Sequence, residues 1–585
     1  MAKFFITNNL QWYKALKENI SNTEFKLSFD YSSEDVYALG VHKLNIVNQN
    51  AIREQNDFCI VTGTCIYKKS LDVLPILHDY KNDIAAIRNS ALGQYAISAF
   101  KKGNISVFTD PIGAYDVYYY NANDGGYIIS SSLYEMAQVI RDNITLDEMA
   151  LLERTIYRCI FGGRSFFNEI KRLRGDECIK IENGSVVVKN IKVEWPCGTE
   201  NNFELNVRNA AVVLKENIRI ANKVLGVPSI YVTGGLDSRL VLASCLANSI
   251  KPKLITITGH SQICFLPYSN QQDIKVAEGY AKRYGLEFVT PDCSSPEPID
   301  KDWENLISNH GFPAAYFWGT TNVLKKTQTN LAHPLHLLGL GGELLRVNLL
   351  KESTKGAKEF GDRLAHKVFD VDVAERVEPS FSEHMDKLVE DEFMYYGIDT
   401  INASEDEMFP IDVAYRAQAN TQSQAFCNHI NYAYNPLLEY NVLKYRVSRN
   451  MANNAKFQIA VTYQLYPDIF ELPIWSGNQH KVLNRKTKLL ESPSYVSDTL
   501  YNSRISNFIR TISPVGLKKK ILRPIKHFIY RFSGKNINNA AMSGFVYPKF
   551  KLKEQKYNIL DEAFIERENA NLWSVFHKTL QMLDF

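Results

Sequence analysis

The sequence predicts an α+β sandwich in its first third, then an α/β region built on a parallel sheet, and a mostly helical part beyond about residue 380. Two observations predict this order. Residues 1–195 contain short runs of alternating hydrophobicity separated by turns rich in Gly, Asn and Asp, which is typical of antiparallel strands. From residue 204 onward, helical patterns alternate with short apolar runs, which indicates parallel strands joined by helical crossovers.

The spacing of apolar residues predicts the individual elements of the first region. Strand patterns lie at 58–67, 95–110, 116–121 and 126–132, and helical patterns lie near 70–91 and 133–157. Residues 178–195 predict a closing hairpin, because Asn183-Gly184 is a dipeptide that two-residue hairpin turns prefer.

The second region predicts strands at 228–233, 253–258 and 286–290, with a helix at 271–285. The chain therefore divides into residues 1–195, residues 204–490 and a C-terminal extension at 491–585. With 585 residues, the chain has ample material for more than one core.

Composition narrows the class of protein. The nine cysteines are scattered without a CxxC pair, which favours reduced thiols in the cytoplasm over a disulfide framework or a zinc site. No apolar run is long enough to span a bilayer, and the first residues lack the pattern of a signal peptide. The twelve histidines show no metal-binding spacing, so we interpret His333 and His336 as ordinary polar positions.

The strongest chemical signal is a glycine-containing loop between an apolar strand and a helix. It consists of Thr233, Gly234, Gly235, Leu236, Asp237 and Ser238. Glycines let backbone N–H groups converge on an anion, and the helix that follows adds its positive end. The two hydroxyls are further donors, and Asp237 is of the type that holds the Mg²⁺ of a polyphosphate. The spacing fits neither the Walker loop nor the dinucleotide fingerprint.

This loop resembles the SGGxDS pyrophosphate-binding loop of ATP pyrophosphatases, and the whole chain resembles the asparagine synthetase superfamily. The N-terminal half carries the landmarks of that family's class II glutamine amidotransferase-like domain, an Ntn-hydrolase-like sandwich, in the family's order. They are GTCIYK (63–68), GQYA (93–96), DPIGAYDVYYY (110–120), ISSSLYE (129–135) and RLRGDECIKI (172–181).

The resemblance continues into the ATP-pyrophosphatase half. DIKVAEGYAKRYGLEF (273–288) matches the family's helix at Asp273, Ala277, Ala281 and Gly285, and Ile257 lies in the strand whose backbone reads adenine in the family. GLGGELLR (339–346) resembles the second phosphate and metal loop. There Gly339, Gly341 and Gly342 match, and Glu343 stands in place of the metal-binding Asp. The resemblance implies ATP and Mg²⁺ as cofactors, with Asp237 and Glu343 sharing the metal.

The chain departs from the family pattern at two positions. Glutamine-hydrolysing members use an N-terminal Cys, whereas this chain has Ala2 and its first cysteine is Cys59, so we expect the first region to be a degenerate amidotransferase-like domain without glutaminase activity. Leu340 stands where glutamine-dependent and β-lactam-forming members place a Glu that assists the attacking amine.

Two further parts of the site follow from the resemblance. Residues 419–450 resemble the helical segment that covers the acyl-adenylate, and the family then places a Lys that stabilises the transition state. Lys481, Lys486 and Lys488 are the candidates by position. The aromatic run in HGFPAAYFWGTT (310–321) lies in the interval expected for the acid-binding pocket.

Together these features predict an ATP-dependent amide-bond-forming ligase. It would adenylate a small-molecule, glycan or peptide carboxylate, release pyrophosphate, and let ammonia or an amine displace AMP. Two alternatives stay open: an intramolecular cyclase of the lasso-peptide or β-lactam synthetase type, against which Leu340 counts, and a nucleotide-binding scaffold without turnover. The oligomeric state, a homodimer included, is left open.

The C-terminal extension carries a basic segment. Between Asp498 and Glu554 there are twelve Lys and Arg and no acidic residue, although the formal net charge of the chain is only +3. Residues 517–532 place apolar side chains at helical spacing with basic ones largely off that stripe. We expect this helix to pack on the acidic body of the protein; the alternative is peripheral contact with the anionic inner face of a membrane. Nucleic-acid binding is not expected, because the stripe lacks interleaved stacking residues.

Overall fold

The computed structural model describes residues 2–481, with gaps. The gaps are 24, 47–49, 81–83, 148, 151–152, 155–158, 183, 192, 196–201, 258–267, 292–333, 347–355, 370–378, 449–454, 473 and 477–478. Lys486, Lys488, the aromatic run at 310–321 and the basic segment at 517–532 therefore lie outside the described residues, as does the whole extension 491–585.

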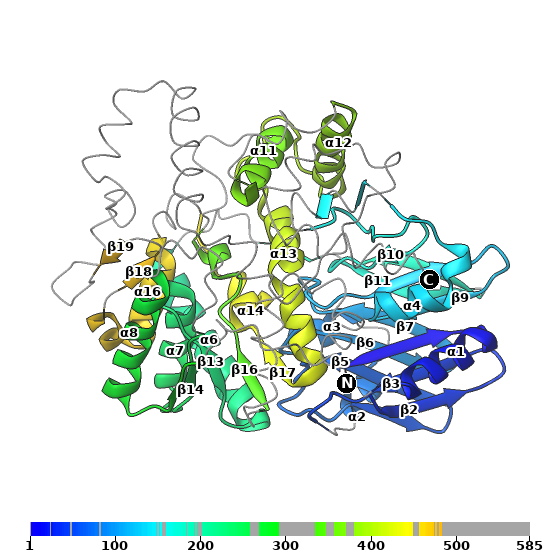
Figure 1. Ribbon diagram of the computed structural model, residues 1–585, viewed down its shortest axis with the longest axis horizontal. Helices are drawn as coiled ribbons and strands as arrows, with labels where there is room; N and C mark the ends of the chain where they lie inside the picture. Colours follow the sequence, from blue (N-terminus) through cyan, green and yellow to red (C-terminus); the bar gives the residue numbers. More distant parts are fainter. Residues whose placement is uncertain are drawn as a thin grey trace, which may run out of the picture.

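Two antiparallel six-stranded sheets form the first part of the chain (Figure 1). The first sheet has the order β10-β8-β9-β1-β3-β2 and the second β12-β11-β7-β6-β5-β4. The strands are β1 (Lys3–Thr7), β2 (Leu27–Ser32), β3 (Tyr37–Val41), β4 (Ala51–Glu54), β5 (Asp57–Gly63), β6 (Tyr95–Lys101), β7 (Asn104–Thr109), β8 (Tyr118–Asn121), β9 (Tyr127–Ser130), β10 (Lys171–Arg172), β11 (Glu177–Glu182) and β12 (Ser185–Asn190).

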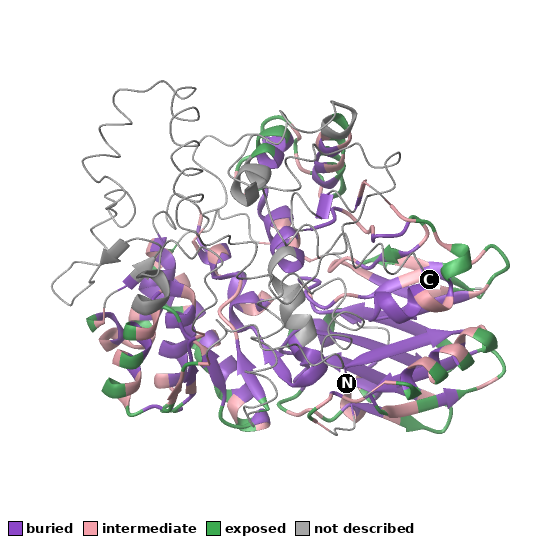
Figure 2. Cartoon of the chain, viewed as in Figure 1, coloured by how far each residue is buried: buried purple, intermediate pink, exposed green. Residues whose placement is uncertain are grey.

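The sheets pack face to face, and helices cover their outer faces. One core joins side chains such as Phe4 of β1 to Phe58 of β5, between the sheets. Two more cores lie under the covering helices. These helices are α1 (Leu10–Ser21), α2 (Leu74–Asp79), α3 (Ile84–Ser90) and α4 (Leu133–Val139), followed by the 3₁₀ turn η1 (Arg141–Asn143). Because the central strands are covered on both sides, β5 and β6 are buried almost throughout (Figure 2).

A parallel five-stranded sheet forms the second part, in the order β15-β14-β13-β16-β17. Its elements are α6 (Phe203–Leu225), β13 (Ser229–Tyr231), α7 (Leu236–Leu246), β14 (Lys253–Ile255), α8 (Tyr268–Tyr284), β15 (Phe288–Val289), β16 (Leu335–Leu337), η3 (Gly342–Leu345) and β17 (Tyr432–Tyr434). The predicted sequence of antiparallel sheets followed by a parallel sheet is thus confirmed.

Helices make up most of the remaining described chain. They are α11 (Gly356–Phe369), α12 (Pro379–Tyr395), α13 (Phe409–Ile430), η5 (Pro436–Leu438), α14 (Tyr440–Leu443), α16 (Lys456–Leu465) and η7 (Pro467–Glu471), with a small hairpin of β18 (Ile474–Ser476) and β19 (Gln479–Lys481). In Figure 1, α13 runs between the antiparallel sheets and the parallel sheet. Its end leads directly into β17, the edge strand next to β16.

Several predicted boundaries need correction. The strand expected at 58–67 ends at Gly63, whose positive φ of 83° turns the chain out of the sheet. The helical stretch expected at 70–91 is broken into the short helices α2 and α3. The one expected from 133 to 157 is interrupted after Val139, and helical residues recur at 149–150 and 153–154. The hairpin expected at 178–195 is present as β11 and β12, with Gly184 in the turn at a φ of 76°.

Polar side chains join the two parts of the chain through buried contacts. Thr64 Oγ1, just after β5, lies 2.7 Å from Asn428 Oδ1 of α13 and donates to the backbone oxygen of Ala433 at 2.9 Å. The side chain of Gln94 exchanges two hydrogen bonds with the backbone of Asn435, at 3.1 and 2.9 Å. The loops of the antiparallel sheets are therefore fixed against β17 and the turn that follows it.

One of these contacts predicts a pH-dependent stability. The buried carboxyl of Glu439 accepts a hydrogen bond from the Gly93 N–H at 2.7 Å, and burial raises the pKa of Glu439 to about 8. In the unfolded chain the pKa of this carboxyl is near its ordinary value of 4.5, so the folded protein keeps the proton up to a higher pH. Stability therefore falls as the pH rises between these two values.

Glu439→Gln removes this titration. We therefore expect the free energy of unfolding of the variant, minus that of the native protein, to rise steadily from about pH 5 to about pH 8. Urea denaturation across that range measures it. The exposed Glu182→Gln is the matched control and should leave the slope unchanged. Identical pH slopes for Glu439→Gln and the native chain would contradict the assignment.

Candidate phosphate-binding site at the parallel sheet

The loop after β13 is held in shape by its own hydroxyl groups. The Thr233 N–H donates to Ser238 Oγ at 3.1 Å, the two hydroxyl oxygens lie 3.2 Å apart, and the Gly235 N–H donates to Thr233 Oγ1 at 3.3 Å. Leu236 then begins α7, with Gly235 at the N-cap. The sequence suggested these hydroxyls as ligand donors; in the structure they order the loop.

A carboxylate of α8 contacts another loop amide. The Gly234 N–H donates to Asp273 Oδ1 of α8 at 2.6 Å, and burial raises the pKa of Asp273. The family pattern had marked Asp273 only as a matching position in a helix. The structure places it on the amide group that an anion would approach.

The second glycine-rich loop lies directly against the first, because β16 is the parallel neighbour of β13. At Gly339 and Gly342 the first loop approaches too closely to leave room for a side chain. A Cβ atom at Gly339 would lie 2.9 Å from the Ser238 nitrogen, and one at Gly342 would lie 2.2 Å from Asp237 Oδ1. Gly341 combines a positive φ of 74° with a Cβ position 2.2 Å from Leu438. The predicted residues of both loops are thus brought together at the carboxyl edge of the sheet, where ligands bind in open α/β sheets.

Each carboxylate expected to hold metal contacts an arginine. Asp237 Oδ2 lies 2.6 Å from Arg346 Nη2, and Asp237 Oδ1 accepts from Gln458 Nε2 at 2.7 Å. Glu343 lies 3.5 Å from Arg416 Nη1. Burial raises the pKa of Asp237, opposed by the charge of Arg346.

Sequence reasoning missed all three partners: Arg346, Arg416 and Gln458. Arg346 is the last residue of the GLGGELLR motif, and its position was a usable signal. Arg416 and Gln458 belong to α13 and α16, which only the tertiary fold brings to this edge.

The site contains buried polar atoms without partners. Arg346 Nε, Arg416 Nη2 and Gln458 Oε1 have no hydrogen-bond partner within the described chain. Two free cationic donors beside two carboxylates fit a polyphosphate with Mg²⁺, because phosphate oxygens would accept from the guanidinium groups. Among the described residues no cluster of three or more His, Cys, Asp or Glu could hold a metal, so Asp237 and Glu343 would need phosphate oxygens and water to complete an octahedral shell.

The other predicted site residues are placed as follows. Ile257 comes two residues after β14 and is half-buried at the same edge of the sheet. Lys481 ends β19, and Lys486 and Lys488 lie outside the described residues. His336 is buried in β16, with its Nδ1 2.6 Å from Ser229 Oγ, which supports its interpretation as an ordinary polar position.

The start of the chain lies within the antiparallel sheets. Ala2 is buried, its N–H donates to the Val41 oxygen at 2.9 Å, and its oxygen accepts from the Tyr115 hydroxyl at 2.6 Å. A nucleophile at this position would need a reactive side chain and a free amine; here the side chain is a methyl group and the amide belongs to the sheet. Cys59 and Cys65 are buried, and burial raises the pKa of both thiols.

Comparisons with known proteins add little to this geometry. No family model matches the chain, and no curated protein matches it. Among solved structures, it is similar to glutamine phosphoribosylpyrophosphate amidotransferase from B. subtilis complexed with ADP and GMP, at 10% identity and a TM-score of 0.23 over 49% of this chain and 65% of that one. A second structure, described as the allosteric regulatory enzyme of purine biosynthesis, is 11% identical, with a TM-score of 0.23 over 49% of this chain and 64% of that one. The chain thus spans less than two thirds of either structure, and a likeness at this TM-score carries no argument.

Proposed function

We propose that this protein is an ATP-dependent ligase that joins a carboxylate to ammonia or an amine through an acyl-adenylate. The observation that carries the proposal is the contact between the two glycine-rich loops, in which Gly342 leaves room only for the carboxylate of Asp237. A shared polyphosphate site explains why both loops keep small residues at the same edge of the sheet.

The residues around these loops have defined roles in the proposal. Asp237 and Glu343 would hold Mg²⁺, which neutralises the pyrophosphate as it leaves. Arg346 and Arg416 supply positive charge beside the same phosphates, the task for which the sequence indicated Lys481 or Lys486. Adenylation suits a carboxylate substrate, because the free anion is a poor electrophile.

Product analysis tests the reaction type. The full-length protein, ATP, Mg²⁺ and a panel of carboxylic acids with ammonium should yield AMP and pyrophosphate. Formation of ADP and phosphate would indicate a different ATP chemistry, and no turnover with any acid, combined with tight ATP binding, would favour the nucleotide-binding scaffold.

We further propose that glutamine is not the nitrogen donor, because Ala2 lacks a nucleophile and its backbone is committed to the sheet. We expect no glutamate to form when the purified protein is incubated with glutamine, with or without ATP. Ammonium should support turnover in the same preparation, which serves as the positive control. Glutamate formation that scales with protein concentration would refute this expectation.

The location proposed for this chemistry is the cytoplasm. Within the part of the chain that the structure describes, no helix has both the length and the apolar character needed to cross a membrane. The basic segment at 517–532 lies outside that part, so its packing on the acidic body and its contact with an anionic membrane both stay predictions.

A further inference from the structure

A separate cavity of about 630 Å³ lies between the antiparallel sheets and the helices α12 and α13. Its volume falls within the range of small-molecule sites. Its walls come from the loops around 111–113, 162, 172–176 and 190–195 and from residues 392–399 and 407–418. No residue of either glycine-rich loop lines it, so it is distinct from the phosphate-binding site.

Helix α13 presents different faces to the two sites. Val413, Ala414 and Ala417 line the cavity. Arg416 points instead toward Glu343 and pairs with Asp412, one turn earlier on the same face. A ligand in the cavity is therefore separated from the candidate phosphate-binding site by the helix itself.

Arg172 lies on the buried side of the cavity. Arg172 is 8% exposed; its Nη1 lies 3.4 Å from Asp116 and its Nη2 lies 3.4 Å from the Gly162 oxygen, while Nε has no partner. A carboxylate or phosphate ligand would be bound by two parallel N–H groups of an arginine. Both Nη atoms of Arg172 are already engaged and its Nε is not accessible from the cavity, so this side chain offers no such pair to an anion.

The rim of the cavity offers acceptors. Asp176, Asp399 and Glu407 line it, and none of the three forms an ion pair with a cation in the described chain. Asp176 accepts from the Tyr395 hydroxyl at 3.1 Å, and Asp399 and Glu407 accept local backbone N–H groups. A carboxylate has about four acceptor positions, so capacity remains. A ligand matching this rim must carry several donors.

Flat aromatic side chains form part of the wall. Trp195 packs edge-on against Phe409 and Tyr440, with ring centroids 5.5 and 5.3 Å apart. Tyr395 is stacked by the Arg174 guanidinium at 3.8 Å, and that guanidinium forms a bidentate ion pair with Glu392 of α12, at 2.8 and 2.7 Å. These contacts tie the sheet loops to α12 and hold the rings in place.

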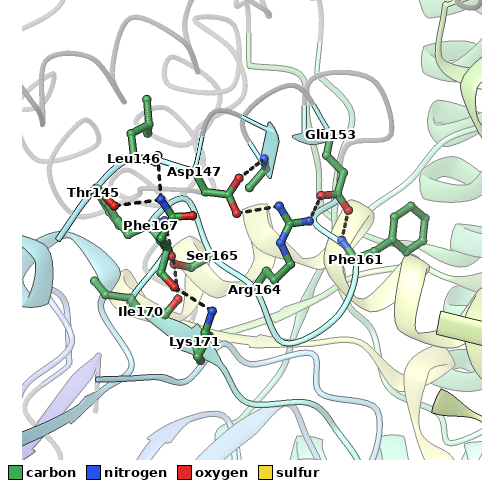
Figure 3. Close-up of polar contacts among 12 residues, drawn as sticks. Thr145, Leu146, Asp147, Glu153, Phe161, Arg164, Ser165, Phe167, Ile170 and Lys171 are labelled. Carbon is green, nitrogen blue, oxygen red and sulfur yellow. Dashed lines mark hydrogen bonds and ion pairs between the residues drawn. The ribbon is translucent and has the colours of Figure 1, made fainter. Parts of the chain in front are cut away.

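The loop that carries Gly162 is fixed as well. Figure 3 shows Arg164 between two carboxylates, 2.7 Å from Asp147 and 2.6 Å from Glu153. The Phe161 N–H donates to Glu153, so the chain just before Gly162 is anchored to the same group. The wall near Arg172 is thus preformed, as binding sites for small molecules usually are.

We propose that this cavity binds a neutral polyhydroxylated molecule with apolar faces, the chemistry of a mono- or disaccharide. Its hydroxyl groups would donate to the rim carboxylates, and its C–H faces would pack on Trp195 and Tyr395. The proposal stands apart from the adenylation reaction, since it requires neither ATP nor the glycine-rich loops.

Saturation-transfer NMR on the full-length protein without ATP tests it. The probes are glucose, galactose, mannose, N-acetylglucosamine and their common disaccharides, with spermidine and lysine as cationic comparison compounds. We expect at least one sugar to bind and the amines not to. Ala414→Phe, which fills the cavity from α13, should abolish that signal, whereas Met394→Ala, at an exposed position beside Tyr395 that does not line the cavity, should keep it.

Tyr395→Ala provides a second variant in case Ala414→Phe does not fold, and it should weaken sugar binding severalfold or more. Binding of amines in place of sugars, no binding by any sugar, or a sugar signal unchanged in a folded cavity variant would each overturn the proposal.

Discussion

Asp237→Asn is expected to abolish carboxylate-dependent ATP–pyrophosphate exchange, lowering it by about 100-fold or more, the range seen when one electrostatic group is removed from a transition state. The side chain keeps its size and can still accept from Gln458, so the loss isolates the negative charge that would hold Mg²⁺. The carboxylate lies where the two loops meet.

The same substitution should leave folding nearly intact. Because burial raises the pKa of Asp237, the ionised carboxylate destabilises the folded protein at neutral pH, and the neutral amide removes that cost. The lost ion pair with Arg346 acts in the opposite direction, so we expect a net change within about 1 kcal/mol.

Glu471→Gln is the matched control for Asp237→Asn, since it removes an exposed carboxylate paired with Arg283 away from the loops. Exchange should be unaffected in this control. Full exchange activity in Asp237→Asn would show that the loop is not the phosphate site.

Arg346→Gln is expected to lower exchange by about 100-fold while ATP binding weakens much less, because its guanidinium is assigned to charge that develops in the transition state. The side chain is 16% exposed and pairs with Asp237, and its Nε has no partner in the described chain. Exchange kinetics together with equilibrium ATP binding separate the two effects.

Arg283→Gln is the control for a lost surface arginine, and Lys481→Gln tests the residue that the sequence indicated. A much larger loss in Lys481→Gln than in Arg346→Gln would contradict the assignment of this role to Arg346.

The sequence predicted the parts of the site that are local in the chain. Both glycine-rich loops follow apolar runs, which marks them locally, although the contacts that constrain Gly339, Gly341 and Gly342 come from distant parts of the sequence. The alternation of helices and strands likewise predicted the parallel sheet. These features depend on residues a few positions apart, where periodicity and turn chemistry are informative.

The missed features depend on tertiary contacts. Gln458 and Arg416 reach the site only because α16 and α13 pack at the sheet edge, and no local pattern marks either residue. Strand β17 has three residues, too few for a periodic signal, although β16 pairs with it along its whole length. The cavity beside α12 joins segments more than 200 residues apart, so its lining could not be predicted either.

The most direct test of the account is carboxylate-dependent exchange of labelled pyrophosphate into ATP by the native protein, with a broad panel of carboxylic acids and Mg²⁺. Reversible adenylation predicts that at least one acid stimulates exchange, that omission of the acid or of Mg²⁺ removes it, and that Asp237→Asn lacks it. A native protein that binds ATP but shows no exchange with any acid, or exchange that persists in Asp237→Asn, would contradict the account.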